Sequence, residues 1–487
     1  MKKMLLCFVL LLMGAAQTAL SQTGLDPSFA VRGISQLRGD GRQMIRNKSG
    51  SIIVRGGLYP YNNPPNQLGY KLDRNGLLRV NSFYNGIILH DTFEFMVLDG
   101  IDGILPTRND YFVSYTDLSD ETGRLALFDS LGHVDYNYGQ GGVAYLPAIS
   151  SAILNTDSQD RVLYAGQCYG CGGGTMGHFV LYRYLPNGTI DSSFAANGRL
   201  EEATTQYAAD VHSVEQTPNG KILLGEKEWM TSWSAYRYLD DGRPDSSFGG
   251  NGRVSIFWRK AFSFTRVQPD KKVLLIGYDA DSVVVVRVNE DGSWDSSYGN
   301  NGIAKAAKGL IEHAVVRPDG RLVLGGNREW HDSTFVIWQM LPDGRIDTSF
   351  GQSGQLTLQV TNAVHTMTGL ALQPDGKIIM GGQAGGLAVV ARFFADGRLA
   401  VQEPEFPESS VQLYPNPTGD VLKVSYPALR EKGSLTVYDI TGRVMQNTPL
   451  SAGSSQTELR VRAFIPGTYI LEVKTSSVRV QKRFLKQ

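Results

Sequence analysis

Aromatic residues beside amide and carboxylate groups occur in three loop-like segments of the sequence, residues 58–65, 226–233 and 327–332. An aromatic ring offers an apolar face to a sugar or a peptide, and neighbouring polar groups fix the orientation of the ligand. We therefore expect these segments to bind a glycan or a protein. The competing interpretation is that the rings only cover apolar parts of the fold. Seven residues are the candidates for binding: Tyr59, Tyr61, Trp229, Trp233, Trp330, His331 and Asp332.

The sequence carries no complete catalytic signature. Neither a His-Glu-x-x-His nor a Gly-x-Ser-x-Gly motif occurs, and the glycines at 172–174 are followed by no lysine or helical pattern that would bind phosphate. We predict no catalytic residue, no metal site and no cofactor. A secreted polysaccharide-degrading enzyme stays as the alternative function, because carboxylates from different repeats could pair in the fold. The acidic candidates for such a pair are Glu226, Glu228, Glu329 and Asp332.

Cys168 and Cys171 are the two cysteines that remain once the N-terminal segment is set aside. A cysteine pair in an exported protein tends to form a disulfide, because the protein meets oxidising conditions. The Cys-x-x-Cys spacing also occurs in redox motifs and in half of a zinc site, but no second pair and no helical pattern accompany it. We predict a structural disulfide or unreactive thiols, with a chemical role as the alternative.

The N-terminus has the pattern of a secretory signal peptide. Lys2 and Lys3 precede an apolar run over residues 5–16, and small residues at Ala19 and Ser21 favour cleavage before residue 22. The apolar run is short for a membrane span, so an uncleaved anchor is the weaker interpretation. No later stretch reaches 18 consecutive apolar residues. We therefore expect no transmembrane segment after removal of residues 1–21.

The composition favours an all-β protein without nucleic-acid binding. Lys+Arg and Asp+Glu both number 47, so the formal net charge is zero, whereas nucleic-acid binders normally have a basic surplus. The 55 glycines and the 10% aromatic content are typical of chains with many turns and strands.

A repeat of about 53 residues runs through most of the chain. Its clearest mark is an aromatic residue at intervals of 50–56 residues. The positions are Phe29, Phe83, Tyr138, Phe194, Phe248, Tyr298 and Phe350. Each unit contains two tight turns: one of the type Pro218-Asn219-Gly220, and one with a glycine such as Gly242 shortly before the aromatic residue. Apolar strands flank both turns, so each unit predicts about four strands.

Seven units of four strands predict a seven-bladed β-propeller. The chain starts with an aromatic motif that has no hairpin before it and ends its repeats at residues 396–399 without such a motif, so the N-terminal piece can complete the last blade. An open array of the same units is the alternative. An arginine and an aspartate recur around the second turn, as in Arg237 and Asp245, and we assign them to an ion pair or an Asx turn rather than to catalysis.

The repeat residues resemble the delta-60 repeat of bacteria, with its Gln-Pro-Asp-Gly-Lys, Asp-Gly and Asp-x-Ser-Phe-Gly elements. The resemblance extends over residues 25–399; it is strong from Arg183 onward and degenerate before it. It implies an extracellular or surface repeat protein and no defined activity. The loops that join second and third strands all emerge on one face of a propeller, and the seven binding candidates fall in these loops.

The end of the chain forms a separate β unit after an acidic, proline-containing linker, residues 401–410. Residues 411–487 contain Leu-Tyr-Pro-Asn-Pro-Thr-Gly-Asp at 413–420, a hairpin-like segment at 437–444 and Pro-Gly-Thr-Tyr at 466–469. These blocks resemble the type A C-terminal sorting domain of the type IX secretion system of Bacteroidetes. The resemblance implies an immunoglobulin-like β-sandwich, recognition by that secretion machinery, and removal on export. An ordinary β-sandwich module is the alternative.

The sequence thus predicts a signal peptide (1–21), a propeller (22–400), a linker (401–410) and a sorting domain (411–487). We expect a protein that passes through the periplasm and is secreted or held at the outer cell surface. Its predicted role is binding or adhesion, with the secreted enzyme and a purely structural surface role as alternatives.

Overall fold

The computed structural model of the chain describes residues 24–30, 34–38, 40–46, 50–57, 67–76, 101–107, 111–117, 122–128, 134–168, 178–203, 209–228, 232–256, 262–279, 282–329, 332–397, 410–429, 432–439, 443–475 and 479–487. The regular elements of these residues are β-strands, in agreement with the predicted all-β class. Within these ranges there is no helix of the length and apolarity that a membrane span requires. The chain divides into two compact units, Met1–Leu399 and Ala400–Gln487.

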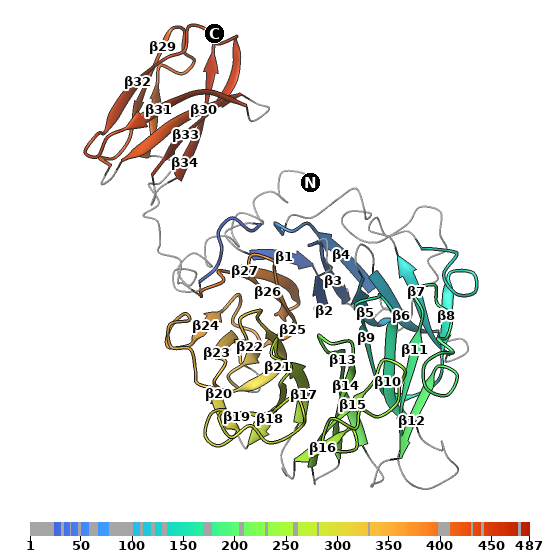
Figure 1. Cartoon of the computed structure of the whole chain (residues 1–487). Coiled ribbons are helices and arrows are strands. Elements are labelled where there is room, and N and C mark those ends of the chain that lie inside the picture. Colours follow the sequence, from blue (N-terminus) through green and yellow to red (C-terminus); the bar gives the residue numbers. More distant parts are fainter. Residues whose placement is uncertain are drawn as a thin grey trace. The chain divides into compact units, whose positions relative to one another are not determined.

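The described residues of the first unit form seven antiparallel sheets, which are the blades of a propeller (Figure 1). Blades 1 and 2 contain β2 (Asp40–Arg46), β3 (Ile52–Gly57) and β4 (Gln67–Leu72), then β5 (Ile101–Pro106), β6 (Tyr111–Asp117), β7 (Thr122–Phe128) and β8 (Val143–Leu146). Blades 3 and 4 contain β9 (Ser150–Thr156), β10 (Val162–Cys168), β11 (His178–Tyr184) and β12 (Arg199–Ala203), then β13 (Ala209–Gln216), β14 (Ile222–Glu228), β15 (Ser232–Tyr238) and β16 (Arg253–Ile256).

Blades 5 to 7 follow the same order of strands. Blades 5 and 6 contain β17 (Phe262–Val267), β18 (Val273–Asp279), β19 (Ser282–Val288) and β20 (Ile303–Lys308), then β21 (Leu310–Val316), β22 (Leu322–Asn327), β23 (Phe335–Met340) and β24 (Gln355–Leu358). Blade 7 contains β25 (His365–Leu372), β26 (Ile378–Ala384), β27 (Leu387–Phe393) and the N-terminal strand β1 (Ile34–Arg38).

The N-terminal segment closes the ring, as predicted. Strand β1 pairs antiparallel with β27 and is the outer strand of blade 7, and Leu25 forms a bridge to Phe393. The first strand of each blade contacts the first strand of the next, in the order β2, β5, β9, β13, β17, β21, β25 and back to β2. These innermost strands surround the centre of the ring in Figure 1. The propeller is therefore closed, and the open array is excluded.

The hydrophobic core lies between neighbouring blades. The second and third strands have both faces covered, so they read as unbroken apolar runs such as Val283–Val286 in β19. The outer strands alternate instead; β24, for example, has buried side chains at every second position. One core cluster joins Leu274 and Val285 of blade 5 to Leu324 and Trp338 of blade 6, which shows how the blades pack face to face.

The second unit is a β-sandwich with its own core, as the resemblance implied. One sheet contains β28 (Gln412–Tyr414), β29 (Val421–Ser425) and β32 (Gln456–Arg460), and the other contains β31 (Val444–Leu450), β30 (Gly433–Asp439), β33 (Gly467–Lys474) and β34 (Arg479–Lys486). Leu422, Leu459, Leu435 and Leu471 are fully buried between the sheets.

The Pro-Asn-Pro-Thr segment of the second unit holds the end of the chain in place. The N–H of Thr418 donates to the carbonyl of Leu485 at 2.8 Å, and the N–H of Gln487 donates back to the carbonyl of Thr418 at 3.0 Å. The side chain of Asn416 accepts from the N–H of Leu485 at 2.9 Å. The motif thus binds the last strand to the body of the sandwich.

Candidate functional site

The recurring arginine and aspartate form an ion pair in four blades. The pairs are Arg183 with Asp191, Arg237 with Asp245, Arg287 with Asp295, and Arg392 with Asp26, at N–O distances of 2.6–2.9 Å. Each aspartate also accepts hydrogen bonds from the N–H and the hydroxyl of the serine two residues later, as Asp245 does from Ser247. The predicted ion pair and the predicted Asx turn are therefore both present.

The same arginines fasten each blade to its neighbour. Their guanidinium groups donate to backbone carbonyls of the next blade, at Asp240, Glu290, Pro342 and Arg74 respectively. They also lie over the repeat aromatic at 4.3–4.9 Å from the ring centre: Phe194, Phe248, Tyr298 and Phe29. Since the fourth pair joins blade 7 to the N-terminal segment and to blade 1, this arrangement closes the ring as well.

The turn glycine completes the contact between blades. Gly76 has a φ of +77°, and a Cβ placed on it would lie 2.4 Å from the ring of Phe29 in the preceding blade. Only glycine allows both the positive φ and this close approach. The recurring aromatic, glycine, arginine and aspartate thus have structural roles.

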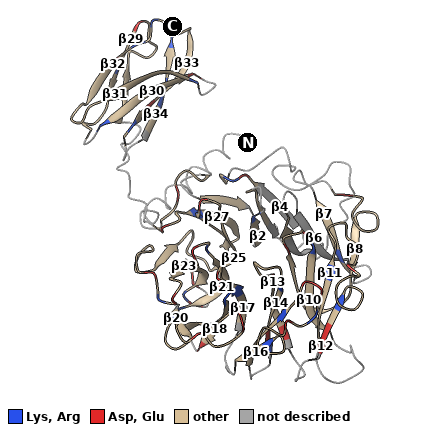
Figure 2. Ribbon diagram, in the orientation of Figure 1, with Lys and Arg blue, Asp and Glu red and all other residues tan. Residues whose placement is uncertain are grey.

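Hydrogen bonds and charge hold these aspartates in the ionised form. Burial raises the pKa of Asp245, but hydrogen bonds from Lys221, Ser247 and Arg237 outweigh it, and the pKa stays well below its usual range. Figure 2 shows acidic and basic residues interspersed along the ribbon of the propeller. A carboxylate with its oxygens occupied in this way is a poor proton donor for catalysis.

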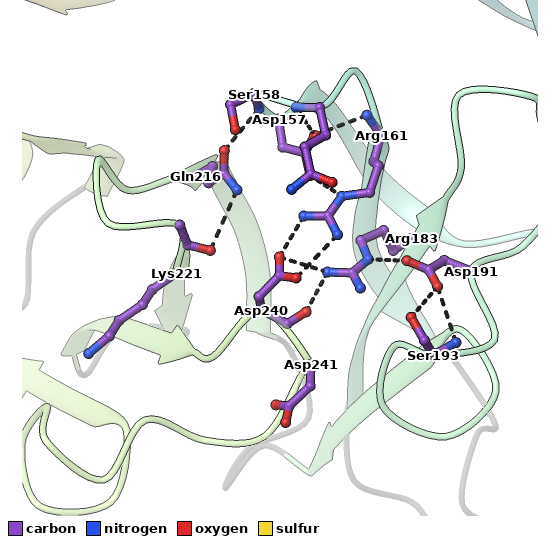
Figure 3. A network of polar contacts seen from close by, with 12 residues as sticks. Asp157, Ser158, Arg161, Arg183, Asp191, Ser193, Gln216, Lys221, Asp240 and Asp241 are labelled. Atoms are coloured by element: carbon purple, nitrogen blue, oxygen red, sulfur yellow. Dashed lines mark hydrogen bonds and ion pairs between the residues drawn. The ribbon is translucent and has the colours of Figure 1, made fainter.

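The interface between blades 3 and 4 departs from the repeat. Arg161 binds Asp157 of its own turn and Asp240 of the next blade, both at 2.5 Å. Asp240 also accepts from Arg183 at 3.1 Å, so two guanidinium groups share one carboxylate (Figure 3). The hydrogen bond from Arg161 is the largest cause of the lowered pKa of Asp240. In the same interface, the N–H of Ser158 donates to Gln216 at 2.9 Å.

Innermost strands are also joined to one another by side chains. Asn155 Nδ2 donates to the carbonyl of Val214 at 2.8 Å, and Arg266 Nε donates to the carbonyl of Ala314 at 2.8 Å. A first strand is an edge of its sheet, so its outer backbone groups need partners from elsewhere. Polar side chains near the strand ends supply these partners. The centre of the ring is therefore polar.

A cavity of about 640 Å³ opens where four of these strands end. Arg46, Pro106, Thr156 and Gln216 are the last residues of β2, β5, β9 and β13, and all four line the cavity. First strands run in one direction around the ring, so their ends and the following turns meet at one rim, which we name the turn rim. The remaining lining residues are Asn155, Asp157, Ser158, Glu215, Thr217, Pro218 and Gly220.

Two polar atoms at this cavity lack hydrogen-bond partners among the described residues: Glu215 Oε1 and Arg46 Nε. Burial raises the pKa of Glu215 to about 7, against the charge of Arg266 and a hydrogen bond from the N–H of Val267. Burial lowers the pKa of Arg46, against the charge of Asp375. Buried polar atoms without partners are uncommon and point to a ligand or to solvent.

Other polar groups of the cavity are engaged within the protein. Asn155 Oδ1 accepts from the N–H of Thr156, and the hydroxyl of Thr156 donates to the carbonyl of Pro106, both at 2.8 Å. Asp157 is held by Arg161. The wall is therefore fixed, while Arg46 and Glu215 keep hydrogen-bonding capacity for something else.

Most of the binding candidates from the sequence lie outside the described residues. These are Tyr59, Tyr61, Trp229, Trp330 and His331, and their role stays a prediction. Asp332 is described: its carboxylate accepts from the N–H of Arg328 at 3.3 Å, and its carbonyl accepts from the N–H of His365 at 2.9 Å. The structure thus places Asp332 between blades 6 and 7, away from the turn rim.

Trp233 corrects the sequence analysis. It was expected in an exposed loop, but it lies in strand β15 and is fully buried. Every side chain of β15 is buried, because the third strand of a blade packs against both neighbouring blades. Its ring belongs to the core cluster with Phe248 and Leu275 and presents no face to a ligand.

Of the predicted disulfide pair, Cys168 is described. It ends strand β10 and is disulfide-bonded. Cys171 lies outside the described residues, so the pairing of the two stays a prediction.

Two parts of the chain match known protein families. Residues 412–487 match the secretion system C-terminal sorting domain. Residues 170–194, 268–298, 317–350 and 373–399 match the beta-propeller described as a domain of unknown function, DUF5122. Both resemblances drawn from the sequence are thereby confirmed. A search of curated proteins gave no match.

Solved structures with some similarity include the following three. PorZ of Porphyromonas gingivalis, a surface component of the type IX secretion system, is 14% identical, with 92% of this chain and 59% of PorZ covered and a TM-score of 0.39. YCF48 of Cyanidioschyzon merolae is 9% identical, with 74% of this chain and 98% of YCF48 covered and a TM-score of 0.39. Regucalcin of Agrobacterium tumefaciens is 12% identical, with 59% of this chain and 88% of regucalcin covered and a TM-score of 0.34.

These structural likenesses carry no conclusion about activity, since the identities are low and the TM-scores are below 0.5. The family matches do bear on location, because a sorting domain of this kind directs export to the cell surface or into the medium. The chain therefore carries repeats that match the DUF5122 beta-propeller, followed by a segment that matches the secretion system C-terminal sorting domain.

Proposed function

We propose that this exported propeller is a binding or adhesion protein that holds a glycan or a protein ligand at its turn rim. The observation that supports the proposal is the cavity of about 640 Å³ with Arg46 and Glu215 in its lining. Its volume falls within the range of about 300–1,000 Å³ that is common for small-ligand sites. Both residues retain a buried polar atom without a partner in the described chain.

Binding accounts for this rim better than cleavage does. Glycoside hydrolysis needs two carboxyl groups on either side of the scissile bond. Of the two carboxyl groups in the lining, Asp157 is engaged with Arg161, which leaves Glu215. The secreted polysaccharide-degrading enzyme is kept as the second outcome of the test.

The aromatic loop residues from the sequence form a second candidate surface for the same function. Loops between second and third strands emerge at the rim opposite the turn rim, because consecutive strands are antiparallel. Trp229 and Trp330 belong to these loops. A ligand could use either rim, and variants of each distinguish them.

The test applies the full chain to a broad array of glycans and proteins and then examines every hit for cleavage products. We expect specific binding without products, reduced in Arg46→Gln and retained in Trp330→Ala. Binding lost only in Trp330→Ala would move the site to the opposite rim. New reducing ends would place the protein among the enzymes, and an empty array would contradict a binding role.

A further inference from the structure

Arg46 and Glu215, which each keep one atom without a partner among the described residues, come from distant parts of the ring. Arg46 ends β2 of blade 1, and Glu215 is on β13 of blade 4, three blades further along the ring. Each has a different opposite charge near it: the charge of Asp375 acts on Arg46, and the charge of Arg266 acts on Glu215. The cavity therefore presents a cation and a separate carboxyl group, between which a ligand has room.

Arg46 selects for an anion. A guanidinium binds a carboxylate through parallel N–H donors, and the interaction is stronger where water is partly excluded, as it is around this half-buried side chain. Asp157 does not compensate Arg46, because Arg161 already holds it at 2.5 Å. A ligand with one carboxylate would satisfy the cation.

The rest of the lining suits a ligand rich in hydroxyl groups. Apart from Pro106 and Pro218, every lining residue is polar or glycine. Sugar hydroxyls both donate to and accept from such side chains, and the rings of Pro106 and Pro218 offer apolar faces beside them. The turn at Gly220 leaves space as well, since a Cβ placed there would meet no atom within 4 Å.

We infer that the turn-rim cavity binds a saccharide that carries a carboxylate, with the carboxylate on Arg46 and a hydroxyl group on Glu215. This inference rests on the proposed binding function and names its ligand class. Arg46 supplies charge recognition, and Glu215 supplies a hydrogen bond that depends on its protonation.

The protonation of Glu215 gives the inference a pH signature. Below pH 7 the carboxyl group is neutral and does not repel an anionic ligand; above pH 7 it is ionised and does. The charged groups around it are Arg266 on β17, with His313 of β21 beyond it, and the Asp157–Arg161 pair after β9. Affinity should therefore fall as pH rises from 6 to 8, while the ligand's own carboxylate stays ionised.

The experiment measures binding of the full chain to acidic trisaccharides built from galacturonate, glucuronate or sialate, by calorimetry at pH 6 and pH 8. Methyl-esterified forms of the same sugars are the matched neutral ligands, and an acidic peptide is the competing class. The site variants are Arg46→Gln and Glu215→Gln. Their matched controls are Arg345→Gln, an arginine of an exposed turn, and Glu312→Gln, another inner-strand carboxyl outside the cavity.

We expect one acidic sugar to bind about tenfold or more tightly than its ester, and to lose about tenfold or more in Arg46→Gln. The parent should bind it up to about tenfold more weakly at pH 8 than at pH 6. Glu215→Gln should abolish that difference, and both controls should behave as the parent.

Equal affinity for the esters, or acidic-sugar binding unchanged in Arg46→Gln, would overturn the inference. If the peptide or another array ligand binds through Arg46 instead, the ligand class is wrong and the proposed function stands. If no ligand of any class binds, the inference and the proposed function are both overturned.

Discussion

At the scale of single residues, two carboxyl groups on innermost strands have unusual environments. Burial raises the pKa of both Glu215 and Glu312 to about 7, although each accepts a backbone hydrogen bond from the next blade. For Glu312 the donor is the N–H of Met367, at 2.6 Å. These carboxyl groups link neighbouring blades, and they make the contact between the blades sensitive to pH.

The sign of that sensitivity follows from proton binding. A carboxyl group with a raised pKa keeps its proton in the folded state between pH 4.5 and 7, while the unfolded chain has released it. Stability due to this group therefore falls as pH rises through that window and stays low above it. Replacing Glu312 by Gln keeps an acceptor for Met367 and removes the ionisable group.

We predict that Glu312→Gln is more stable than the parent at pH 8, by the order of 1–3 kcal/mol, and nearly equal to it at pH 4.5. Thermal or urea unfolding of both chains across this range measures the difference. Comparing variant with parent cancels the opposite contribution of His313, whose pKa burial lowers to about 4. A difference that does not grow with pH would contradict the assignment.

The buried ion pair of each blade gives a second prediction at this scale. In Arg237→Ala, Asp245 keeps Lys221 but loses the buried guanidinium, and the carbonyl of Glu290 loses its donor, so the free energy of unfolding should fall by roughly 3 kcal/mol. The matched control is Arg243→Ala. That arginine pairs with Asp241 at the surface with 75% of its side chain exposed, and its loss should cost under about 0.5 kcal/mol. Similar losses in both variants would show that the repeated pair does not fasten the blades.

At the scale of elements, the closed ring depends on a short N-terminal segment. Strand β1 completes blade 7, and Asp26 replaces the aspartate that the last repeat lacks by pairing with Arg392 and Lys377. The carbonyl of Arg74 in blade 1 accepts from Arg392. The two ends of the ring thus meet through one small set of side chains.

A chain that begins at Asp40 lacks this segment and should expose β27 as an edge strand. We predict faster hydrogen exchange in β25–β27 and a lower unfolding temperature, while a chain that begins at Gly24 should match the full chain. Hydrogen exchange followed by mass spectrometry compares the three. Unchanged protection of β27 in the shorter chain would contradict closure by β1.

Much of the element order could be predicted from the sequence, because its signals are local. Tight turns with glycine, unbroken apolar runs and the spacing of the aromatic residues indicate four strands per unit and seven units. The position of Trp233 could not be predicted from the sequence, because its segment resembles a loop in composition. Burial from both neighbouring blades makes it a strand, and a single sequence does not show that packing.

The cavity was missed for a related reason. Arg46 and Glu215 are 169 positions apart in sequence, and only the ring brings their strand ends to one rim. A weak signal existed: Glu215 puts a charge near the end of an inner strand where blade 6 has Val315. The binding prediction depends on the variable aromatic loops, and most of its candidate residues lie outside the described residues.

At the scale of the whole molecule, the chain combines an export signal with a ring whose turn rim holds the proposed ligand site. The sorting domain has its own core and holds its last strand through Asn416 and Thr418. Its family directs export, so location is decided at the C-terminus, while the proposed ligand site lies in the propeller. The sorting domain and the propeller are separate compact units.

Removal of residues 411–487 should therefore stop export without unfolding the propeller. We predict accumulation of the truncated protein in the periplasm, measured by cell fractionation, with a melting transition of the propeller like that of the parent. Deletion of residues 401–409 alone is the control and should leave export intact. Surface or medium localisation of the truncated chain would contradict the role of the sorting domain.

The most direct test of the whole account locates the ligand on the propeller. Hydrogen exchange of the full chain is measured with and without the best ligand from the array. We predict protection at residues 155–158, 215–218 and 220, which line the cavity at the turn rim. Protection confined to the loops around Trp229 and Trp330, or no protection at all, would contradict it.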